Sequence, residues 1–142
     1  MRIRDILQTK GSDVVVIDPE SSVRDLVILL KQHNLGAVIV SSNGRTMAGI
    51  VSERDVVRLL ADDGDALSAR VADVMTESVE SCQPADSVES LMATMTEHRI
   101  RHLPVLDENG QLGGIVSIGD VVKSTITQLK FERDRLQEYV ST

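Results

Sequence analysis

The stretch Gly114-Ile115-Val116-Ser117-Ile118-Gly119-Asp120 has the pattern of a buried strand, a sharp turn and the first turn of a helix. A close copy, Gly49-Ile50-Val51-Ser52-Glu53-Arg54-Asp55, lies 65 residues earlier. In each copy a Ser precedes an Asp by three residues, and Val-Val follows the Asp. The chain is therefore predicted to contain a duplicated strand–turn–helix unit.

The duplication extends well beyond this motif. Residues 13–60 align with residues 78–125 at the same offset and without a gap, so the two copies should have elements of equal length. Residues 3–7 also resemble residues 71–75, but at an offset of 68, which places three extra residues around positions 10–12. We predict two repeats, residues 1–65 and residues 66–142.

Each repeat is predicted to be an α+β unit with the order strand, helix, strand, strand, helix. The strands are predicted at 14–17, 37–40 and 47–52, then at 79–82, 102–106 and 112–117. Ser22 and Ser87 are expected to cap the first helix of each repeat, and helices should also start near Glu53 and near Asp120. A unit of roughly 60 residues is marginal alone, so the repeats should bury their sheet faces against each other.

The last predicted helix runs to about residue 140, beyond anything that the first repeat offers to cover it. Its apolar residues recur at steps of 4, 3, 7 and 4, which is close to a coiled-coil seam: Val122, Ile126, Leu129, Leu136 and Val140. We predict that this tail packs on a partner chain. The alternative is that it folds back on its own domain or frays.

Composition limits the kinds of partner. The formal net charge is −7 and aromatic residues make up 1% of the chain, so we expect neither nucleic-acid binding nor membrane binding. The beginning of the chain has no apolar signal-peptide core, and its apolar runs are too short to span a bilayer, so a cytoplasmic location is expected. With one Cys and three His residues, no metal site is expected, and Cys82 is interpreted as a core residue.

The repeated Ser-x-x-Asp has two interpretations. A Ser at a strand–helix junction with an acid three residues later is a capping-box variant, which is a purely structural role. A helix N-terminus also presents free N–H groups that suit phosphate, while a carboxylate in its first turn can accept the two adjacent hydroxyls of a ribose. The residues alone leave both interpretations open for Ser52 and Asp55 and for Ser117 and Asp120.

Taken together, the two Gly-Ile-Val-Ser-x-x-Asp motifs and the segment Ile100-Arg101-His102-Leu103-Pro104-Val105 resemble the CBS (cystathionine β-synthase) domain family. The resemblance covers nearly the whole chain. It implies a pair of repeats with pseudo-two-fold symmetry that binds adenosine-containing ligands in two clefts. These ligands are AMP, ADP or ATP, with S-adenosylmethionine or a dinucleotide such as NAD(H) as the alternative. The family also implies a homodimer.

Carrying the family's binding positions over to this sequence gives two candidate clefts. The first consists of Ile50, Ser52, Arg54 and Asp55, facing Thr76, Val79, Arg101 and His102. The second consists of Ile115, Ser117, Gly119 and Asp120, facing Val14, Gly36 and Ala37. In both, Asp would bind ribose hydroxyls, Ser would meet the sugar or phosphate, and aliphatic residues would sandwich the adenine.

The two clefts are not equivalent. The first has arginines and a histidine for phosphate, where the second has Gly119, Gly36 and Ala37, so we expect the Asp55 cleft to bind nucleotide more tightly. The resemblance implies a regulatory sensor that acts on an unidentified downstream protein. It implies no enzyme activity and no prosthetic group, and Mg²⁺ is possible with ATP. The alternatives are a nucleotide-processing enzyme and a structural dimer without a ligand.

Overall fold

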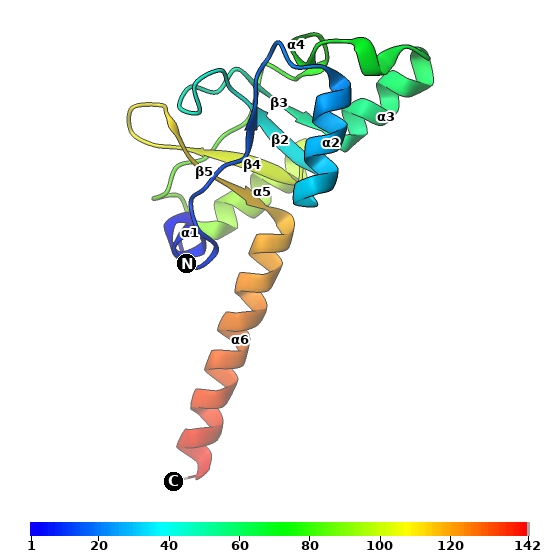
Figure 1. Ribbon diagram of the computed structural model, residues 1–142. Coiled ribbons are helices and arrows are strands. Elements are labelled where there is room, and N and C mark those ends of the chain that lie inside the picture. Colours follow the sequence, from blue (N-terminus) through cyan, green and yellow to red (C-terminus); the bar gives the residue numbers. More distant parts are fainter. Residues whose placement is uncertain (142) are drawn as a thin grey trace.

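A computed structural model of the chain describes residues 1–141 and consists of two α+β repeats with a long C-terminal helix (Figure 1). The elements of the first half are α1 (Ile3–Lys10), β1 (Val16–Ile17), α2 (Val23–His33), β2 (Ala37–Val40), β3 (Gly49–Ser52) and α3 (Glu53–Asp62). Those of the second half are η1 (Ala66–Ser68), α4 (Val71–Val74), α5 (Val88–His98), β4 (His102–Leu106), β5 (Leu112–Ser117) and α6 (Ile118–Ser141).

Each repeat has its own sheet, and the two sheets share one plan. In the first, β1 lies parallel to β2, and β2 pairs with β3 in an antiparallel hairpin that sets Ala37 opposite Ser52. In the second, β4 and β5 form the equivalent hairpin, with His102 opposite Ser117. The strand predicted at Val79–Cys82 is reduced to one bridge between Cys82 and Val105, because the preceding residues line a cleft instead of pairing.

Helices α2 and α5 begin at the predicted caps. The side chain of Ser22 accepts a hydrogen bond from the Asp25 N–H, and Ser87 does the same for the Ser90 N–H. Asn34 ends α2 in the left-handed conformation (φ 52°), and Arg99 ends α5 in the same way (φ 55°). His33 and His98 are the last residues of these helices, where an imidazolium is favourable.

Each half of the chain contributes a helix to the core of the other half. The predicted division of the chain at residue 65 stays a prediction. Helix α1 belongs to the second core, where Ile3 and Ile6 pack with β4, β5 and α5. In return, Val71 of α4 packs in the first core. Backbone hydrogen bonds fix both exchanges, from the Ile3 N–H to the Asp86 carbonyl and from the Val71 N–H to the Ser21 carbonyl. Each core therefore needs residues from both halves of the chain.

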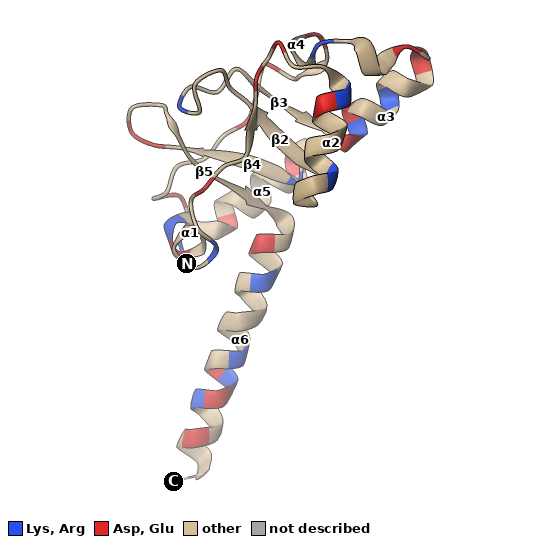
Figure 2. Cartoon of the chain, in the orientation of Figure 1, with Lys and Arg blue, Asp and Glu red and all other residues tan. Residues whose placement is uncertain are grey.

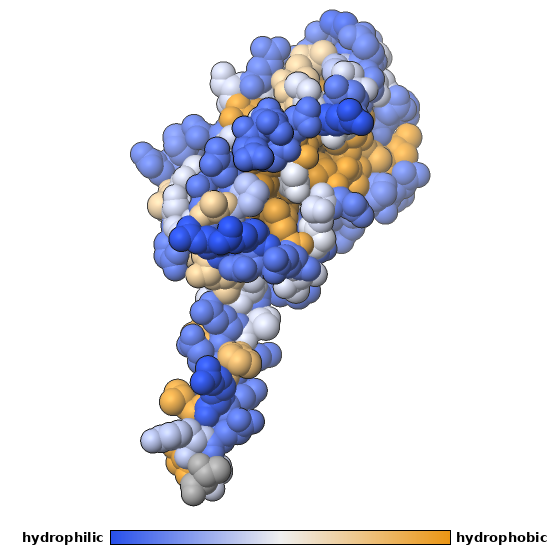
Figure 3. Space-filling model, turned by 90° about the vertical axis from the view of Figure 1, so that its left-hand side faces the viewer, coloured by the Kyte–Doolittle hydropathy of each residue, from blue (hydrophilic) through white to orange (hydrophobic). Residues whose placement is uncertain are grey.

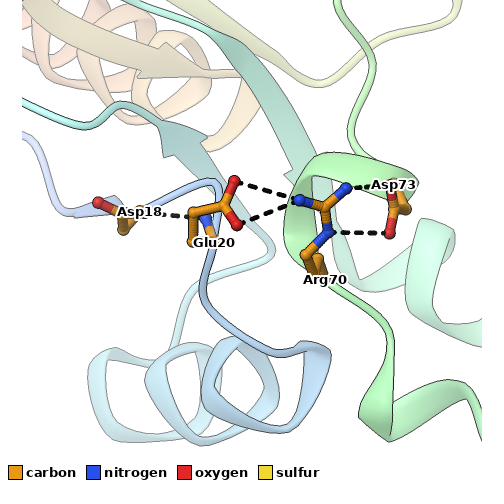
Figure 4. A network of polar contacts seen from close by, with 4 residues as sticks. All are labelled: Asp18, Glu20, Arg70 and Asp73. Carbon is orange, nitrogen blue, oxygen red and sulfur yellow. Dashed lines mark hydrogen bonds and ion pairs between the residues drawn. The ribbon is translucent and has the colours of Figure 1, made fainter.

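An ion-pair cluster on the surface accompanies the second exchange (Figure 4). Arg70, just before α4, contacts Glu20 at 3.1 Å and Asp73 at 3.1 Å. The Glu20 N–H in turn donates to the Asp18 carboxylate at 2.8 Å. The hydrogen bonds to Asp73 and Glu20 raise the pKa of the Arg70 guanidinium. All these groups are exposed, so the cluster orients the segment before α4 more than it stabilises the fold.

Cys82 is buried in the second core, as predicted. Burial, with a smaller contribution from the charge of Asp86, raises the pKa of its thiol to about 12. The thiol therefore stays protonated near neutral pH and has little nucleophilic character.

Replacing Gly49 with alanine should destabilise the protein by about 1–3 kcal/mol through overpacking. A Cβ at this position would lie 2.7 Å from the Thr76 carbonyl oxygen and 2.9 Å from Met75 Sδ. Urea unfolding would measure the loss. Gly113→Ala is the matched control in β5, because its Cβ would lie 3.6 Å from the nearest atom, the Val105 carbonyl oxygen. Equal losses in the two variants would show that the contact with Thr76 is not tight.

Candidate functional site

A cleft of about 960 Å³ lies between the two repeats at the start of α3. Its walls come from β2, β3 and α3 of the first repeat, from the segment after α4, and from the end of α5 and the start of β4. The volume is within the range that small-molecule sites occupy. The residues that line it are Gly36, Ala37, Ile50, Ser52, Glu53, Arg54, Asp55, Val57, Arg58, Thr76, Ser78, Val79, Glu80, His98, Arg99, Ile100, Arg101 and His102.

All eight residues that were predicted for the first cleft line this one: Ile50, Ser52, Arg54, Asp55, Thr76, Val79, Arg101 and His102. Arg54 and Asp55 are placed by the first turn of α3, because Ser52 is the N-cap of that helix. Thr76 is placed by backbone pairing with Ile50, with N–H to carbonyl distances of 3.0 and 2.9 Å. Thus the backbone pairing of Thr76 with Ile50 brings a segment of the second half of the chain to the cleft.

Ser52 and Asp55 form a capping box, which confirms the structural interpretation of this pair. The Ser52 N–H donates to Asp55 Oδ2 at 2.8 Å, and the Ser52 hydroxyl is 3.1 Å from the same oxygen. Among the described residues, every hydrogen bond to this carboxylate ends on Oδ2. Oδ1 therefore keeps its capacity to accept hydrogen bonds from a ligand in the cleft.

The opposite walls of the cleft carry four arginines. Arg54 and Arg58 lie one turn apart on α3, while Arg99 and Arg101 flank the loop between α5 and β4. The cleft also contains Glu53 and Glu80, and Glu80 lies 3.8 Å from His98 Nε2. The guanidinium groups can fork onto phosphate oxygens from two sides, so this arrangement suits an anion with several oxygens.

Gly36, Ala37 and His102 line the same cleft. Gly36 and Ala37 were predicted to face Asp120, but they line the Asp55 cleft, because the Gly36 carbonyl accepts the Glu53 N–H at 3.0 Å. A Cβ on Gly36 would lie 3.4 Å from the His102 ring. Their predicted role in the second cleft stays a prediction, as does that of Val14, which is half-buried between α1 and β1.

The second motif repeats the capping geometry at the start of α6. The Ser117 N–H donates to Asp120 Oδ2 at 2.8 Å, and Gly119 lies in the same turn. Unlike the first motif, the second contacts a lysine: Lys10 Nζ lies 2.5 Å from Asp120 Oδ2 and 2.6 Å from the Ile115 carbonyl oxygen. Burial alone would raise the pKa of Asp120, but hydrogen bonds from Lys10 and Ser117 outweigh it and lower the pKa.

The stability of the protein should fall as the pH drops below about 6.5, the ordinary pKa of imidazole. Burial, and then the positive charge of Lys10, lower the pKa of His102 in the folded state. The unfolded chain therefore binds more protons than the folded one in this range, and acid favours unfolding. Urea unfolding at pH 7.5 and 5.5 should show a smaller pH-dependent loss in His102→Gln. An equal loss in both proteins would contradict this assignment.

Several residues of the cleft escaped sequence reasoning: Glu53, Val57, Arg58, Ser78, Glu80, His98, Arg99 and Ile100. Arg58 had a usable signal, because it lies four residues after Arg54 and so on the same helix face. Arg99 had none, since its position depends on the left-handed end of α5. Lys10 was noticed only as part of an insertion, and its contact with Asp120 requires knowing where α1 packs.

Among residues 1–141, no three His, Cys, Asp or Glu side chains lie close enough together to hold a metal ion. None of the helices in this part of the chain has the length and apolar character that crossing a membrane requires.

Comparison with known proteins identifies the family. The CBS domain model matches residues 3–62 and 71–126. The mitochondrial CBS domain-containing protein CBSX3 of Arabidopsis thaliana is 35% identical, over 97% of this chain and 71% of its own. The structure of the CBS-domain containing protein ATU1752 from Agrobacterium tumefaciens is similar, with 42% identity, a TM-score of 0.83, and coverage of 87% of this chain and 92% of that one.

A structure of CBSX2 in complex with AMP is 27% identical, with a TM-score of 0.77, and covers 91% of this chain and 98% of that one. The two matched segments correspond to the two repeats, and the solved structures share their arrangement. The chain therefore belongs to the CBS domain family and is a pair of CBS repeats.

Proposed function

We propose that this chain is a regulatory module that binds an adenine nucleotide, AMP, ADP or ATP, in the Asp55 cleft and has no catalytic activity of its own. The observation that carries the proposal is the pairing, in one cleft, of a carboxylate with a free acceptor oxygen and four arginines. A sugar diol needs the first and a phosphate needs the second.

Each part of a nucleotide has a matching surface in this cleft. The ribose hydroxyls would donate to Asp55 Oδ1, and the phosphate would lie between the N-terminus of α3 and the Arg99–Arg101 side. Ile50 and Val79 would hold the adenine by dispersion and burial, since no Phe, Tyr or Trp is among the described residues that line the cleft. The relative CBSX2, crystallised in complex with AMP, supports this class of ligand.

The basic lining also ranks the alternative ligands. S-adenosylmethionine carries a sulfonium cation, which four arginines would disfavour, whereas the pyrophosphate of a dinucleotide such as NAD(H) would be attracted. Mg²⁺ would enter only with the phosphates of ATP. We therefore expect adenine nucleotides first, dinucleotides second and S-adenosylmethionine last.

A thermal-shift panel followed by calorimetry tests the proposal. At 100 times its dissociation constant a ligand should add about 2.7 kcal/mol to the free energy of unfolding. AMP, ADP, ATP, NAD⁺ and S-adenosylmethionine should be compared, and ATP incubated with the protein should be recovered intact. A flat panel would favour a structural dimer without a ligand, and release of ADP or AMP would favour an enzyme.

We further propose that two copies assemble through the exposed helix faces. Val27 and Val57 of the first repeat are exposed, and so are Met92 and Val122, which occupy the same positions of the second. Figure 3 shows hydrophobic surface gathered on one side of the folded body. A patch repeated by the pseudo-two-fold axis is suited to a symmetric interface, in which each copy buries the patch of the other.

The tail of α6 extends this surface. Residues 125–141 are all exposed, and Figure 1 shows α6 leaving the folded body. Charged residues alternate along it with uncharged stretches (Figure 2), and Ile126, Leu129, Leu136 and Val140 form the predicted seam. A ligand that binds better to one arrangement of repeats or copies would shift the population toward it, and this shift would be sensed by a downstream protein.

Val122→Glu should convert the dimer to monomers, because it places a charge in the repeated apolar patch. Sedimentation velocity at micromolar concentration would measure the change. Lys123→Glu, at the adjacent exposed position, is the control that changes the charge more but lies outside the patch. A wild-type protein that sediments as a monomer would contradict the proposal.

A further inference from the structure

The two repeats differ in what pairs with the central residue of the Gly-Ile-Val-Ser strand. In the first repeat the Ile50 carbonyl accepts a hydrogen bond from the backbone N–H of Thr76 at 2.9 Å. In the second repeat the equivalent carbonyl, of Ile115, accepts one from Lys10 Nζ at 2.6 Å. A charged side chain therefore stands in the second repeat where the first has a backbone amide.

The length of the preceding helix explains this difference. Helix α4 ends at Val74, and extended backbone at Met75 then leads Thr76 to Ile50. Helix α1, its counterpart, continues to Lys10 before the chain turns at Gly11. The last turns of α1 lie directly on β5, since Leu7 Cδ2 is 2.8 Å from where a Cβ on Gly114 would stand. The extra residues of the first copy thus place an ammonium group beside the second motif.

Lys10 spans the two groups whose equivalents line the open cleft. Its ammonium contacts both the Ile115 carbonyl and the Asp120 carboxylate, and Ile50 and Asp55 are the matching residues of the first repeat. The side chains of the pair are 30% and 24% exposed, so the contact is partly shielded from water. Among the described residues, the Asp55 carboxylate accepts hydrogen bonds from Ser52 only.

We infer that Lys10 decides which cleft takes a nucleotide: it closes the Asp120 site and leaves the Asp55 cleft to bind one nucleotide per chain. The inference rests on the proposed function. A ribose diol can reach Asp120 only by displacing the ammonium, which then loses both of its acceptors while still partly buried. At Asp55 the diol meets a carboxylate that, within residues 1–141, accepts hydrogen bonds from Ser52 and forms no ion pair.

Lys10 could instead assist binding in the second cleft, and the two roles predict opposite effects of its removal. If the ammonium turned to bind the phosphate of a ligand in the second cleft, it would replace the arginines that this cleft lacks. Removing Lys10 would then weaken nucleotide binding at the second cleft. If Lys10 closes that cleft, its removal should allow a nucleotide to bind there. The contacts to both the strand carbonyl and the carboxylate favour the closing role.

Calorimetric titration of the full chain with AMP tests the inference, using Lys10→Met and Lys10→Arg. Methionine keeps most of the apolar stem but removes the charge, and arginine keeps the charge. The wild type and Lys10→Arg should bind one AMP per chain in the range that saturates the Asp55 cleft. Lys10→Met should bind a second AMP in that range, with affinity for the second cleft raised about tenfold or more. Two AMP per wild-type chain, or no more AMP per Lys10→Met chain than per wild-type chain, would overturn the inference.

The double variant Lys10→Met/Asp55→Ala separates this inference from the proposed function. It should bind one AMP, in the second cleft. If the wild type binds no AMP but Lys10→Met does, the proposed function of the Asp55 cleft fails and the closing role of Lys10 stands. If neither protein binds AMP, both are overturned.

Discussion

Replacing Asp55 with alanine is expected to weaken AMP binding by about a hundredfold or more. Each ribose hydroxyl that donates to a carboxylate contributes about 1.5–3 kcal/mol. The Asp55 carboxylate has the acceptor capacity for both hydroxyls, because its hydrogen bonds within the chain end on Oδ2. Loss of two such bonds corresponds to at least two factors of ten in the dissociation constant, measured by calorimetric titration.

Asp25→Ala is the matched control for this prediction. Asp25 completes the same capping box with Ser22 at the start of α2, away from the cleft residues. Both variants should lose about 0.3–1.5 kcal/mol of stability from the weakened cap, but only Asp55→Ala should lose affinity. Equal affinities of the two variants would mean that Asp55 serves the helix alone.

Leu103→Ala should destabilise the protein by about 2–5 kcal/mol, the usual range for a buried leucine that leaves a cavity. Leu103 of β4 is fully buried, opposite Val116 and in the core that also contains Ile3 and Leu91. Chemical unfolding would measure the loss. Because β4 begins at His102, the cleft should lose order together with the core.

The conservative variant Leu103→Met is the control for the effect of lost side-chain volume. It keeps the side-chain volume and should cost less than about 1.5 kcal/mol. A loss below 1 kcal/mol for Leu103→Ala, on the order of a surface substitution, would show that the site collapses around the smaller side chain or that β4 is not a core strand.

Strands and helix caps that are determined by neighbouring residues could be predicted from the sequence. The strands Ala37–Val40, His102–Leu106 and Leu112–Ser117 have the predicted bounds, because short apolar runs ended by turn residues determine them. The caps at Ser22 and Ser87 were also predicted, because a Ser just before a helical apolar pattern favours an N-cap. The prediction of a strand at Val79–Cys82 was wrong, because Val79 lines the cleft and only Cys82 pairs with another strand.

The exchange between the halves could not be predicted, because it depends on long-range packing. Nothing in the sequence of α1 indicates that Ile3 and Ile6 belong with β4 and β5 rather than with their own repeat. The contact of Lys10 with Asp120 follows from that exchange and was missed with it. The Ser52–Asp55 capping box could be predicted because it depends on local spacing, while the place of Arg99 in the cleft depends on how the second repeat faces the first.

A crystal structure of the protein grown with AMP tests the central claim most directly. We expect AMP in the Asp55 cleft, with its ribose hydroxyls within hydrogen-bond distance of the Asp55 carboxylate, its adenine between Ile50 and Val79, and its phosphate on the arginines. The Lys10–Asp120 contact should persist in the same crystal. AMP bound at Asp120 with the Asp55 cleft empty would contradict the account.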